Sequence, residues 1–426
     1  MMVRFFYNIL IPLLIPGALI RLWFRGRREP AYRHHIAERF GYMPSSLGPG
    51  ADIWLHAVSA GESIAAAPLV EALLAQGHTL VLSTTTPTGR AQLMRQFSGR
   101  AVICYGPFDA QRCIKRFLNQ VRPKLALMIE TEIWPNWMTA CASREIPVAL
   151  LNARLSERSF QGYQKLGSMM GATLRQFSWI AVQSNAHANR FAALGAKADR
   201  LSVTGSIKAD QVRPADYTEQ VTLIRTKCGH RTLLLAASTH PGEEQILLAS
   251  FMALKVTHPD LLMVLVPRHV QRVSALQTLS AQMGLLSCRA TLDGVAEDTD
   301  VVIVDVMGQL LYWYGASAVA FVGGSLVPHG GHNFLEAALC GCAIVTGPWV
   351  FNFEAQAEQF QRAEALTLVA DERALTAALE TLLVDPVIRQ QQIDRAQQLV
   401  DESRGALDQL LIGLSPWLPS RAVTPR

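Results

Sequence analysis

The sequence predicts an α/β protein of two domains, each built on a parallel β-sheet, with an apolar segment at the N-terminus. Short continuous apolar runs such as Leu125–Ile129 and Val319–Val322 alternate with helical patterns, which is typical of parallel sheets covered by helices on both faces. The length of 426 residues suits two domains of roughly 200 residues each. We therefore expect two such domains that face each other across a central cleft.

The composition favours a membrane contact over nucleic acid. Half of the residues are hydrophobic, 17% are charged, and the net charge is +5. Arginines cluster near the N-terminus: Arg21, Arg25, Arg27, Arg28, Arg33 and Arg39. Because no basic helix or aromatic platform accompanies them, we expect anionic lipid rather than nucleic acid as their partner. The seven scattered cysteines contain no CxxC pair and indicate free thiols in a reducing compartment.

The N-terminal segment Phe5–Ile20 is almost wholly apolar and is flanked by Arg4 and Arg21. As a helix it would cover about 24 Å, whereas a bilayer's hydrocarbon core is about 30 Å thick. Pro12 and Pro16 weaken a straight helix further. A single span and an interfacial anchor both remain open, while the lack of an A-x-A site disfavours a cleaved signal peptide. The arginines that follow the segment place the body of the protein in the cytoplasm.

The first domain is expected to run from about Asp52 to Thr204. Its predicted strands are Ile53–Val58, Leu80–Ser83, Leu125–Ile129, Val148–Leu151 and Ile180–Val182, with a helix over Ile64–Leu74. Polar loops follow these strands, and the carboxyl ends of parallel strands meet at one edge of a sheet, where ligands bind.

Two carboxylates in these loops, Glu62 and Glu130, stand directly at strand ends, which makes them candidates for chemistry. The alternative for this edge is structural. Glu132 could complement a helix dipole, and Arg154 with Glu157 could form a surface pair.

The second domain repeats the plan. Its predicted strands are Leu233–Ser238, Leu261–Val266, Val301–Asp305, Val319–Val322 and Ala343–Thr346. The helical segment Asp385–Leu411 could cross back to the first domain.

Phe321–Gly341 is the most distinctive stretch of the second domain, because it joins a strand to a helix through Gly323, Gly324, Gly330 and Gly331. Glycines let a backbone approach a ligand closely, and the free N–H groups of a helix start can hold a phosphate. The alternative is a glycine-rich turn with Asn333 as N-cap and Glu336 as its capping-box partner.

Three further groups are candidates. Arg268 ends a strand and suits a phosphate, although a salt bridge is the alternative. Lys208 lies at the domain junction, where it could reach a ligand or act as a solvated hinge residue. His329 and His332 flank the second glycine pair and show no metal-site spacing, so we interpret them as loop donors or packing groups.

Many motifs occur together in a fixed order. They are His56–Glu62, Thr86–Gly89, Glu130–Asn136, Asn152–Ser156, Gly205–Lys208, Val266–His269, Phe321–Val327, Gly330–Asn333, Leu335–Ala338 and Gly347–Pro348. In these strings the chain resembles the bacterial 3-deoxy-D-manno-octulosonic acid (Kdo) transferases over nearly its whole length.

The resemblance implies a GT-B fold and transfer of Kdo from CMP-Kdo to a lipid A precursor (lipid IVA), in lipopolysaccharide inner-core biosynthesis. It implies a membrane anchor over residues 1–30, an acceptor-binding domain over 31–212 and a CMP-Kdo-binding domain over 213–426. The expected place is the cytoplasmic face of the bacterial inner membrane, in contact with its lipids, and no cofactor or metal is implied.

The resemblance also implies residue roles. Glu62 looks like the general base, and Glu130 and Lys208 look like groups that stabilise the transition state. The residues that look like the CMP site are Pro267, Arg268, Met307, Gly308, Gln309, Asn333, Phe334, Leu335 and Glu336. Gln309 stands where the family has a glutamate and Phe334 where it has a proline, which matters only if side chains make those contacts.

Two other functions stay open at this point. One is a membrane-surface GT-B glycosyltransferase that uses a UDP-sugar, and the other is a non-catalytic nucleotide-binding membrane module. Similar motifs accompany the addition of one, two or more Kdo residues.

Overall fold

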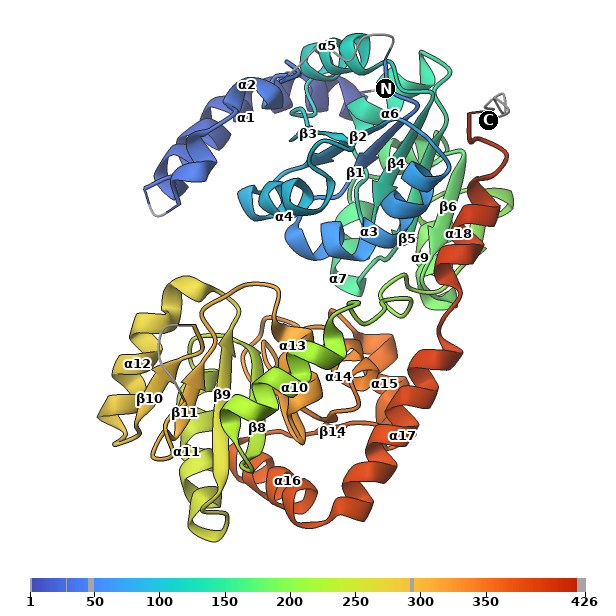
Figure 1. Ribbon diagram of the computed structural model, residues 1–426. Helices are drawn as coiled ribbons and strands as arrows, with labels where there is room; N and C mark the ends of the chain where they lie inside the picture. Colours follow the sequence, from blue (N-terminus) through green and yellow to red (C-terminus); the bar gives the residue numbers. More distant parts are fainter. Residues whose placement is uncertain (1, 28, 45–49, 292–294, 420–426) are drawn as a thin grey trace, which may run out of the picture. The chain divides into compact units, whose positions relative to one another are not determined.

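The computed structural model describes residues 2–27, 29–44, 50–291 and 295–419, and the chain folds into two compact units (Figure 1). Unit 1 runs to Asp210 and resumes at Arg404, and unit 2 comprises Gln211–Ser403. Each unit contains a seven-stranded sheet in which every paired strand is parallel. The predicted pair of parallel α/β units is confirmed.

The sheet of unit 1 has the strand order β3-β2-β1-β4-β5-β6-β7. Its strands are β1 Ile53–His56, β2 Leu80–Thr84, β3 Val102–Tyr105, β4 Leu125–Ile129, β5 Val148–Ala153, β6 Trp179–Val182 and β7 Leu201–Val203. Its helices are α1 Met2–Arg25, η1 Pro30–Arg33, α2 Ile36–Arg39, α3 Ala60–Ala75, α4 Pro87–Phe97, α5 Gln111–Val121, α6 Pro135–Ala142, α7 Glu157–Gln164, α8 Ser168–Leu174, α9 Asn185–Ala193, η2 Ala198–Arg200 and α18 Ala406–Leu414. The order changes direction between β1 and β4, and such a switch point is where α/β sheets bind ligands.

Apolar residues on both faces of the first sheet explain why its central strands read as continuous apolar runs. Trp54 packs with Phe117 in the core on one face, whereas Leu55 packs with Leu69 in the core on the other. The two edge strands, β3 and β7, were not predicted; β7 is largely exposed, so its sequence carries a weaker apolar signal than the central strands do.

The sheet of unit 2 has the order β10-β11-β9-β8-β12-β13-β14. Its strands are β8 Thr232–Thr239, β9 Leu261–Pro267, β10 Ser287–Arg289, β11 Val301–Ile303, β12 Val319–Val322, β13 Ala343–Thr346 and β14 Thr367–Leu368. Its helices are α10 Tyr217–Cys228, α11 Glu243–Thr257, η3 Val270–Arg272, α12 Val273–Gln282, α13 Leu310–Ala316, α14 Leu335–Leu339, α15 Glu354–Arg362, α16 Glu372–Val384 and α17 Pro386–Glu402.

The C-terminal helix α18 belongs to unit 1, although the expected boundary assigned all of 213–426 to the second domain. The carboxylate of Asp210 accepts hydrogen bonds from the backbone N–H groups of Gly405 and Leu407 at 2.6 and 2.5 Å. Leu410 and Leu414 are fully buried in the core of unit 1. The return of the C-terminal helical segment to the first domain, which the sequence allowed, therefore occurs after Ser403, and its partner Asp210 lies 195 positions away in the chain.

The N-terminal helix α1 continues through Pro12 and Pro16 to Arg25. At ~1.5 Å per residue, 24 residues cover about 36 Å, so the helix is longer than the predicted apolar core of the segment. It is long and apolar enough to cross a membrane, and none of its apolar window is buried within the unit. Large apolar side chains, including Phe5, Leu13 and Trp23, are exposed along it.

Candidate active site

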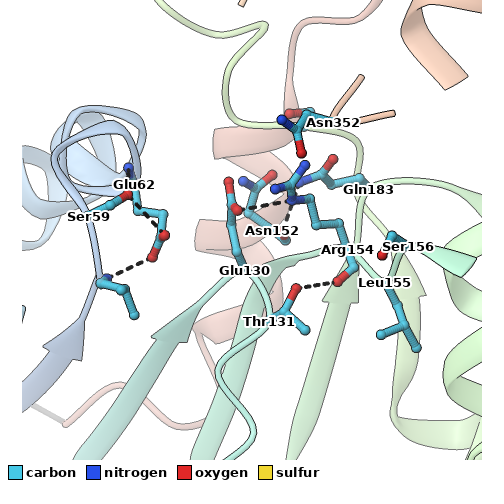
Figure 2. Close-up of polar contacts among 12 residues, drawn as sticks. Ser59, Glu62, Glu130, Thr131, Asn152, Arg154, Leu155, Ser156, Gln183 and Asn352 are labelled. Carbon is cyan, nitrogen blue, oxygen red and sulfur yellow. Dashed lines mark hydrogen bonds and ion pairs between the residues drawn. The ribbon is translucent and has the colours of Figure 1, made fainter. Parts of the chain in front are cut away.

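Glu62 lies in the first turn of α3, immediately after β1, where Ser59 caps the helix. The Glu62 carboxylate accepts hydrogen bonds from the backbone N–H of Val58 at 2.7 Å and from the Ser59 hydroxyl at 3.0 Å. The Ser59 oxygen in turn accepts from the Glu62 N–H, which completes a reciprocal cap. This capping holds the carboxylate at the carboxyl edge of the sheet (Figure 2).

Glu130 follows β4, the strand beside β1, and its side chain is buried. Lys208 Nζ lies 2.9 Å from one carboxylate oxygen of Glu130, and Arg154 Nε lies 3.1 Å from the other. Figure 2 shows Arg154 on the side of Glu130 opposite Glu62. The structure thus brings the predicted residues Glu62, Glu130 and Lys208 to one edge of the sheet. The strands β1 and β4 end at this edge, and the loops after β5 and β7 begin there.

The backbone at this edge is strained in two places. Glu130 has a φ of 64° and Asn152 has a φ of 52°, in the left-handed region that residues other than glycine rarely adopt. Each such residue costs on the order of 1–3 kcal/mol unless its surroundings hold it. The Asn152 side-chain oxygen accepts from the Ile207 N–H at 3.2 Å, which ties down the loop that carries Lys208. Strain held in this way is characteristic of functional sites.

The two carboxyl groups are driven to opposite ionisation behaviour. Burial raises the pKa of Glu62 above its ordinary value, and repulsion from Glu130 raises it further, against hydrogen bonds from Val58 and Ser59. Burial alone would raise the pKa of Glu130 as well, but the charges of Lys208 and Arg154 outweigh it and hold that pKa below its usual range. One carboxyl group is therefore fixed as an anion while its neighbour can exchange a proton.

Glu132 and His56 extend this site, although the sequence indicates His56 only as the first residue of the motif His56–Glu62. Glu132 accepts from the Trp134 indole N–H, and His56 Nε2 lies 3.6 Å from the same carboxylate. His56 is almost fully buried and its Nδ1 lies 2.8 Å from the Ser83 hydroxyl. The position of His56 at the end of β1 is the sequence feature that could have marked it as a site residue. Glu132 is therefore part of the edge and does not act as a free helix-dipole charge.

The first part of the glycine-rich turn after β12, residues 324–326, is not open to a phosphate. The buried carboxylate of Glu243 accepts from the backbone N–H groups of Gly324, Ser325 and Leu326 at 2.8–3.0 Å and from that of His240 at 2.9 Å. These amides are already satisfied from within the unit. The suggested capping box is also not formed, because α14 begins at Leu335 with Phe334 at its N-cap.

Histidines gather beside this turn. Nε2 of His240 and Nε2 of His332 are 2.8 Å apart, and the ring of His329 stacks on His240 at 4.1 Å between centroids. Burial lowers the pKa of His240 to about 4 and that of His332 to about 3, with neighbouring histidines and Arg268 adding to the effect. Within the described ranges, no group of three or more His, Cys, Asp or Glu side chains is arranged to hold a metal ion.

The strand order β11-β9-β8-β12 brings the expected nucleotide residues to one edge of the second sheet. Pro267 and Arg268 lie at the end of β9, Met307–Gln309 lie between β11 and α13, and Asn333–Glu336 lead into α14. The side chains of Phe334 and Leu335 are buried in the core of unit 2, so only their backbones can face a ligand. The Asn333 amide donates to the Glu336 carboxylate at 3.0 Å.

Replacing Glu243 with glutamine should destabilise unit 2, because the new amide group cannot accept from all the backbone donors that now converge there. A buried donor without a partner costs about 1–3 kcal/mol. Urea unfolding should show a loss of this size for Glu243→Gln and almost none for the exposed Glu380→Gln. Equal stability of the two variants would show that the amides do not depend on the carboxylate.

The family model described as 3-deoxy-D-manno-octulosonic-acid transferase (kdotransferase) matches residues 34–211. The chain is 38% identical over 421 residues to the 3-deoxy-D-manno-octulosonic acid transferase of Haemophilus influenzae, covering 97% of this chain and 99% of that protein. It is 32% identical to the enzyme of the same name from Bordetella pertussis, over 97% of this chain and 99% of that one.

Solved structures resemble the fold at low identity. A putative UDP-N-acetylglucosamine 2-epimerase from Listeria monocytogenes matches with a TM-score of 0.60 and 14% identity, over 88% of this chain and 98% of that one. A glycosyltransferase from Rickettsia africae matches with a TM-score of 0.59 and 13% identity, over 87% and 100%. These neighbours confirm the GT-B type of architecture. The full-length relatives go further: the chain belongs to the 3-deoxy-D-manno-octulosonic acid (Kdo) transferase family and is a glycosyltransferase of lipopolysaccharide biosynthesis.

Proposed function

We propose that the protein moves Kdo from CMP-Kdo to a hydroxyl group of a lipid A precursor, with Glu62 as the general base. The observation that carries this proposal is the pair of carboxyl groups at the switch point of the first sheet. Glu130 is held as an anion by two cations, while Glu62 has a raised pKa. A base is most effective when its pKa lies near the operating pH, and the raised value moves Glu62 towards it.

In the proposed reaction the acceptor oxygen forms a bond to the anomeric carbon of Kdo. The bond from that carbon to the CMP phosphate breaks, CMP leaves with the electron pair, and Glu62 takes the acceptor's proton. Lys208 and Glu130 are assigned to stabilise the charges that develop, because their ion pair fixes the ammonium group before the reaction begins. Pre-positioned charges of this kind cost no reorganisation when the reaction occurs.

The donor site is assigned to unit 2. Arg268 supplies a permanent positive charge there, whereas the lowered pKa values of His240 and His332 favour neutral rings at pH 7. Pro267, Met307, Gly308, Gln309 and the backbone of 333–336 complete the assigned CMP site. Because the side chain of Phe334 is buried, its contact with CMP would be made by the backbone, and replacement of the family's proline does not remove it.

We place the enzyme at the cytoplasmic face of the inner membrane, with α1 lying in the interface. Arg4, in the first turn of α1, donates to the carbonyl oxygen of Pro135, and Tyr7 donates to Asp109. The other end of α1 continues into η1 and α2 of the same unit. Both ends therefore belong on the side of the membrane that holds unit 1, and the exposed apolar side chains between them suit an interfacial helix.

Glu62→Gln keeps the size of the side chain but removes the carboxylate that takes the proton. General base catalysis contributes about 10²–10⁴-fold, so kcat should fall by that factor while CMP affinity stays unchanged. Mass spectrometry of lipid A precursor incubated with CMP-Kdo measures both the rate and the number of Kdo residues added. Near-normal kcat in Glu62→Gln would refute the assignment.

Glu130→Gln provides the matched test of ionisation. Glu62 must be deprotonated to act as a base, so activity rises as pH rises through its pKa. Removing the neighbouring negative charge lowers that pKa, and the acid limb of the pH–kcat profile of Glu130→Gln should move to lower pH. A limb that stays in place would mean that Glu62 is not the group that titrates.

Arg268→Ala should weaken CMP binding by about tenfold or more, because a hydrogen bond to a charged group contributes about 1.5–3 kcal/mol. Calorimetry with CMP measures this directly. The exposed Arg373→Ala in the same unit is the control for a general loss of positive charge. Unchanged affinity in Arg268→Ala would place the nucleotide elsewhere.

The interfacial position of α1 predicts that an N-terminal epitope tag stays on the cytoplasmic side. Protease added to the outside of spheroplasts should leave the tag intact, and protease added to inverted membrane vesicles should remove it. A tag that is digested in spheroplasts would show that α1 spans the membrane.

A further inference from the structure

The N-terminal helix contacts the unit that carries the two carboxylates, and its polar contacts are specific. The Tyr7 hydroxyl donates to Asp109 Oδ2 at 2.6 Å. The Arg4 guanidinium donates to the carbonyl oxygen of Pro135 at 3.2 Å and to the Thr139 hydroxyl. Figure 1 shows the N-terminal end of α1 beside α6, whereas the rest of α1 extends away from the sheet. An anchor that only tethers the protein would need no such contacts.

Asp109 connects α1 to α6, because its carboxylate contacts both helices. It is 5% exposed, and its carboxylate accepts from the backbone N–H groups of Asn136 at 3.2 Å and Trp137 at 2.9 Å. The Asn136 side chain donates back to the Asp109 carbonyl oxygen at 2.7 Å. The N-cap residue of α6, Trp134, makes no side-chain cap of its own. Asp109 is therefore the group that caps this helix, from a distant loop.

The helix α6 begins directly after the loop that leads from Glu130 to Trp134. Trp137, in its first turn, packs edge-to-face on the ring of His56 with 4.9 Å between centroids. His56 and Trp134 both contact the carboxylate of Glu132. Only four residues separate Glu130 from the start of α6 at Pro135, so a shift of that start moves the loop with it.

We infer that Tyr7 and Arg4 are positioning residues: by holding Asp109 and the first turn of α6, the membrane helix fixes the loop that carries Glu130 and Glu132. This inference rests on the proposed function of that loop. It makes α1 a support of the acceptor side of the active site as well as a membrane contact. A lipid-facing helix that supports the site links membrane binding to transfer, and the acceptor is itself a lipid.

The ionisation of Asp109 should make this arrangement visible in the pH dependence of activity. Burial raises the pKa of Asp109 to about 6, while hydrogen bonds from Tyr7, Asn136 and Trp137 and the charge of Arg4 oppose the rise. Burial raises the pKa of Tyr7; Tyr163 is a second tyrosine near this pair, and its charge raises that pKa further, whereas the charge of Arg4 lowers it. Loss of the Tyr7 hydroxyl removes one opposing contact, so the pKa of Asp109 rises and its capping anion is lost at a higher pH.

The test uses full-length protein in nanodiscs of anionic lipid, with CMP-Kdo and lipid A precursor. Tyr7→Phe should lower kcat/KM for the acceptor by between about tenfold and about a hundredfold, the cost of misplacing a reacting group by about 1 Å. Below the acid limb set by Glu62, protonation of Asp109 should cause a second fall in activity; in Tyr7→Phe this second fall should begin at a higher pH than in the wild type, and CMP affinity should not change. Phe6→Leu, on the exposed side of α1, is the matched control and should behave as the wild type.

Asp109→Asn should show a similar loss of kcat/KM but no second fall at low pH, because its side chain does not titrate. If Tyr7→Phe proves unfolded by circular dichroism, Arg4→Lys gives the same test, since it keeps the charge and loses the donor fork. Wild-type kcat/KM and an unchanged pH profile in the folded variants would overturn the inference. A wild-type protein that transfers no Kdo would instead refute the proposed function.

Discussion

The ionised carboxylate of Glu130 is the interaction on which the active-site edge of unit 1 depends. A charge buried without partners costs several kcal/mol, so this position requires Lys208 and Arg154. They come from the loops after β7 and β5, so both ion pairs form only when these loops reach the end of β4. The positive φ of Glu130 persists because these contacts hold it. The raised pKa of Glu62 is then partly a consequence of the anion beside it.

Unit 2 solves a similar problem with a different outcome. Glu243 is also a buried carboxylate at a strand-to-helix turn, but it is stabilised by backbone N–H groups instead of side-chain cations. It joins the start of α11 to the turn after β12, which makes the glycine-rich stretch a structural joint. The fixed positive charge of Arg268, next to the histidines, is then the stronger candidate for holding a phosphate. The two units share the same α/β architecture, but the buried carboxylate of Glu130 pairs with cations and that of Glu243 holds backbone N–H groups.

The helix α1 has two sides with different partners. Arg4 and Tyr7 bind polar groups of unit 1, and the exposed apolar side chains have no partner in the part of the chain that is described. If the apolar side faces lipid, as we propose, the helix couples the position of the membrane to that of α6. For an enzyme whose acceptor is a lipid, this coupling brings the sheet edge and the bilayer surface into a defined relation within unit 1.

The sequence by itself determined the class of fold and pointed to several residues that the structure brings to one edge of the first sheet. Continuous apolar runs such as Leu125–Ile129 predict strands covered on both faces, and parallel strands always present their carboxyl ends at one edge. Glu62 and Glu130 could be selected for that reason before any contact was known. The position of Lys208 at a domain junction and that of Arg268 at a strand end mark both as candidates, and the resemblance to the family motifs implies their roles.

Only the tertiary structure decided which polar groups pair across the chain. The sequence shows the glycines of Phe321–Gly341. It does not show that the Glu243 carboxylate accepts hydrogen bonds from backbone N–H groups of this stretch, because Glu243 lies about eighty residues away. The choice of Asp210 as the partner of Gly405 joins residues 195 positions apart, and the docking of Tyr7 on Asp109 joins residues 102 positions apart. Local periodicity records which face of an element is buried. It does not record which of many similar carboxylates ends beside a given donor, since that choice is made when the elements pack.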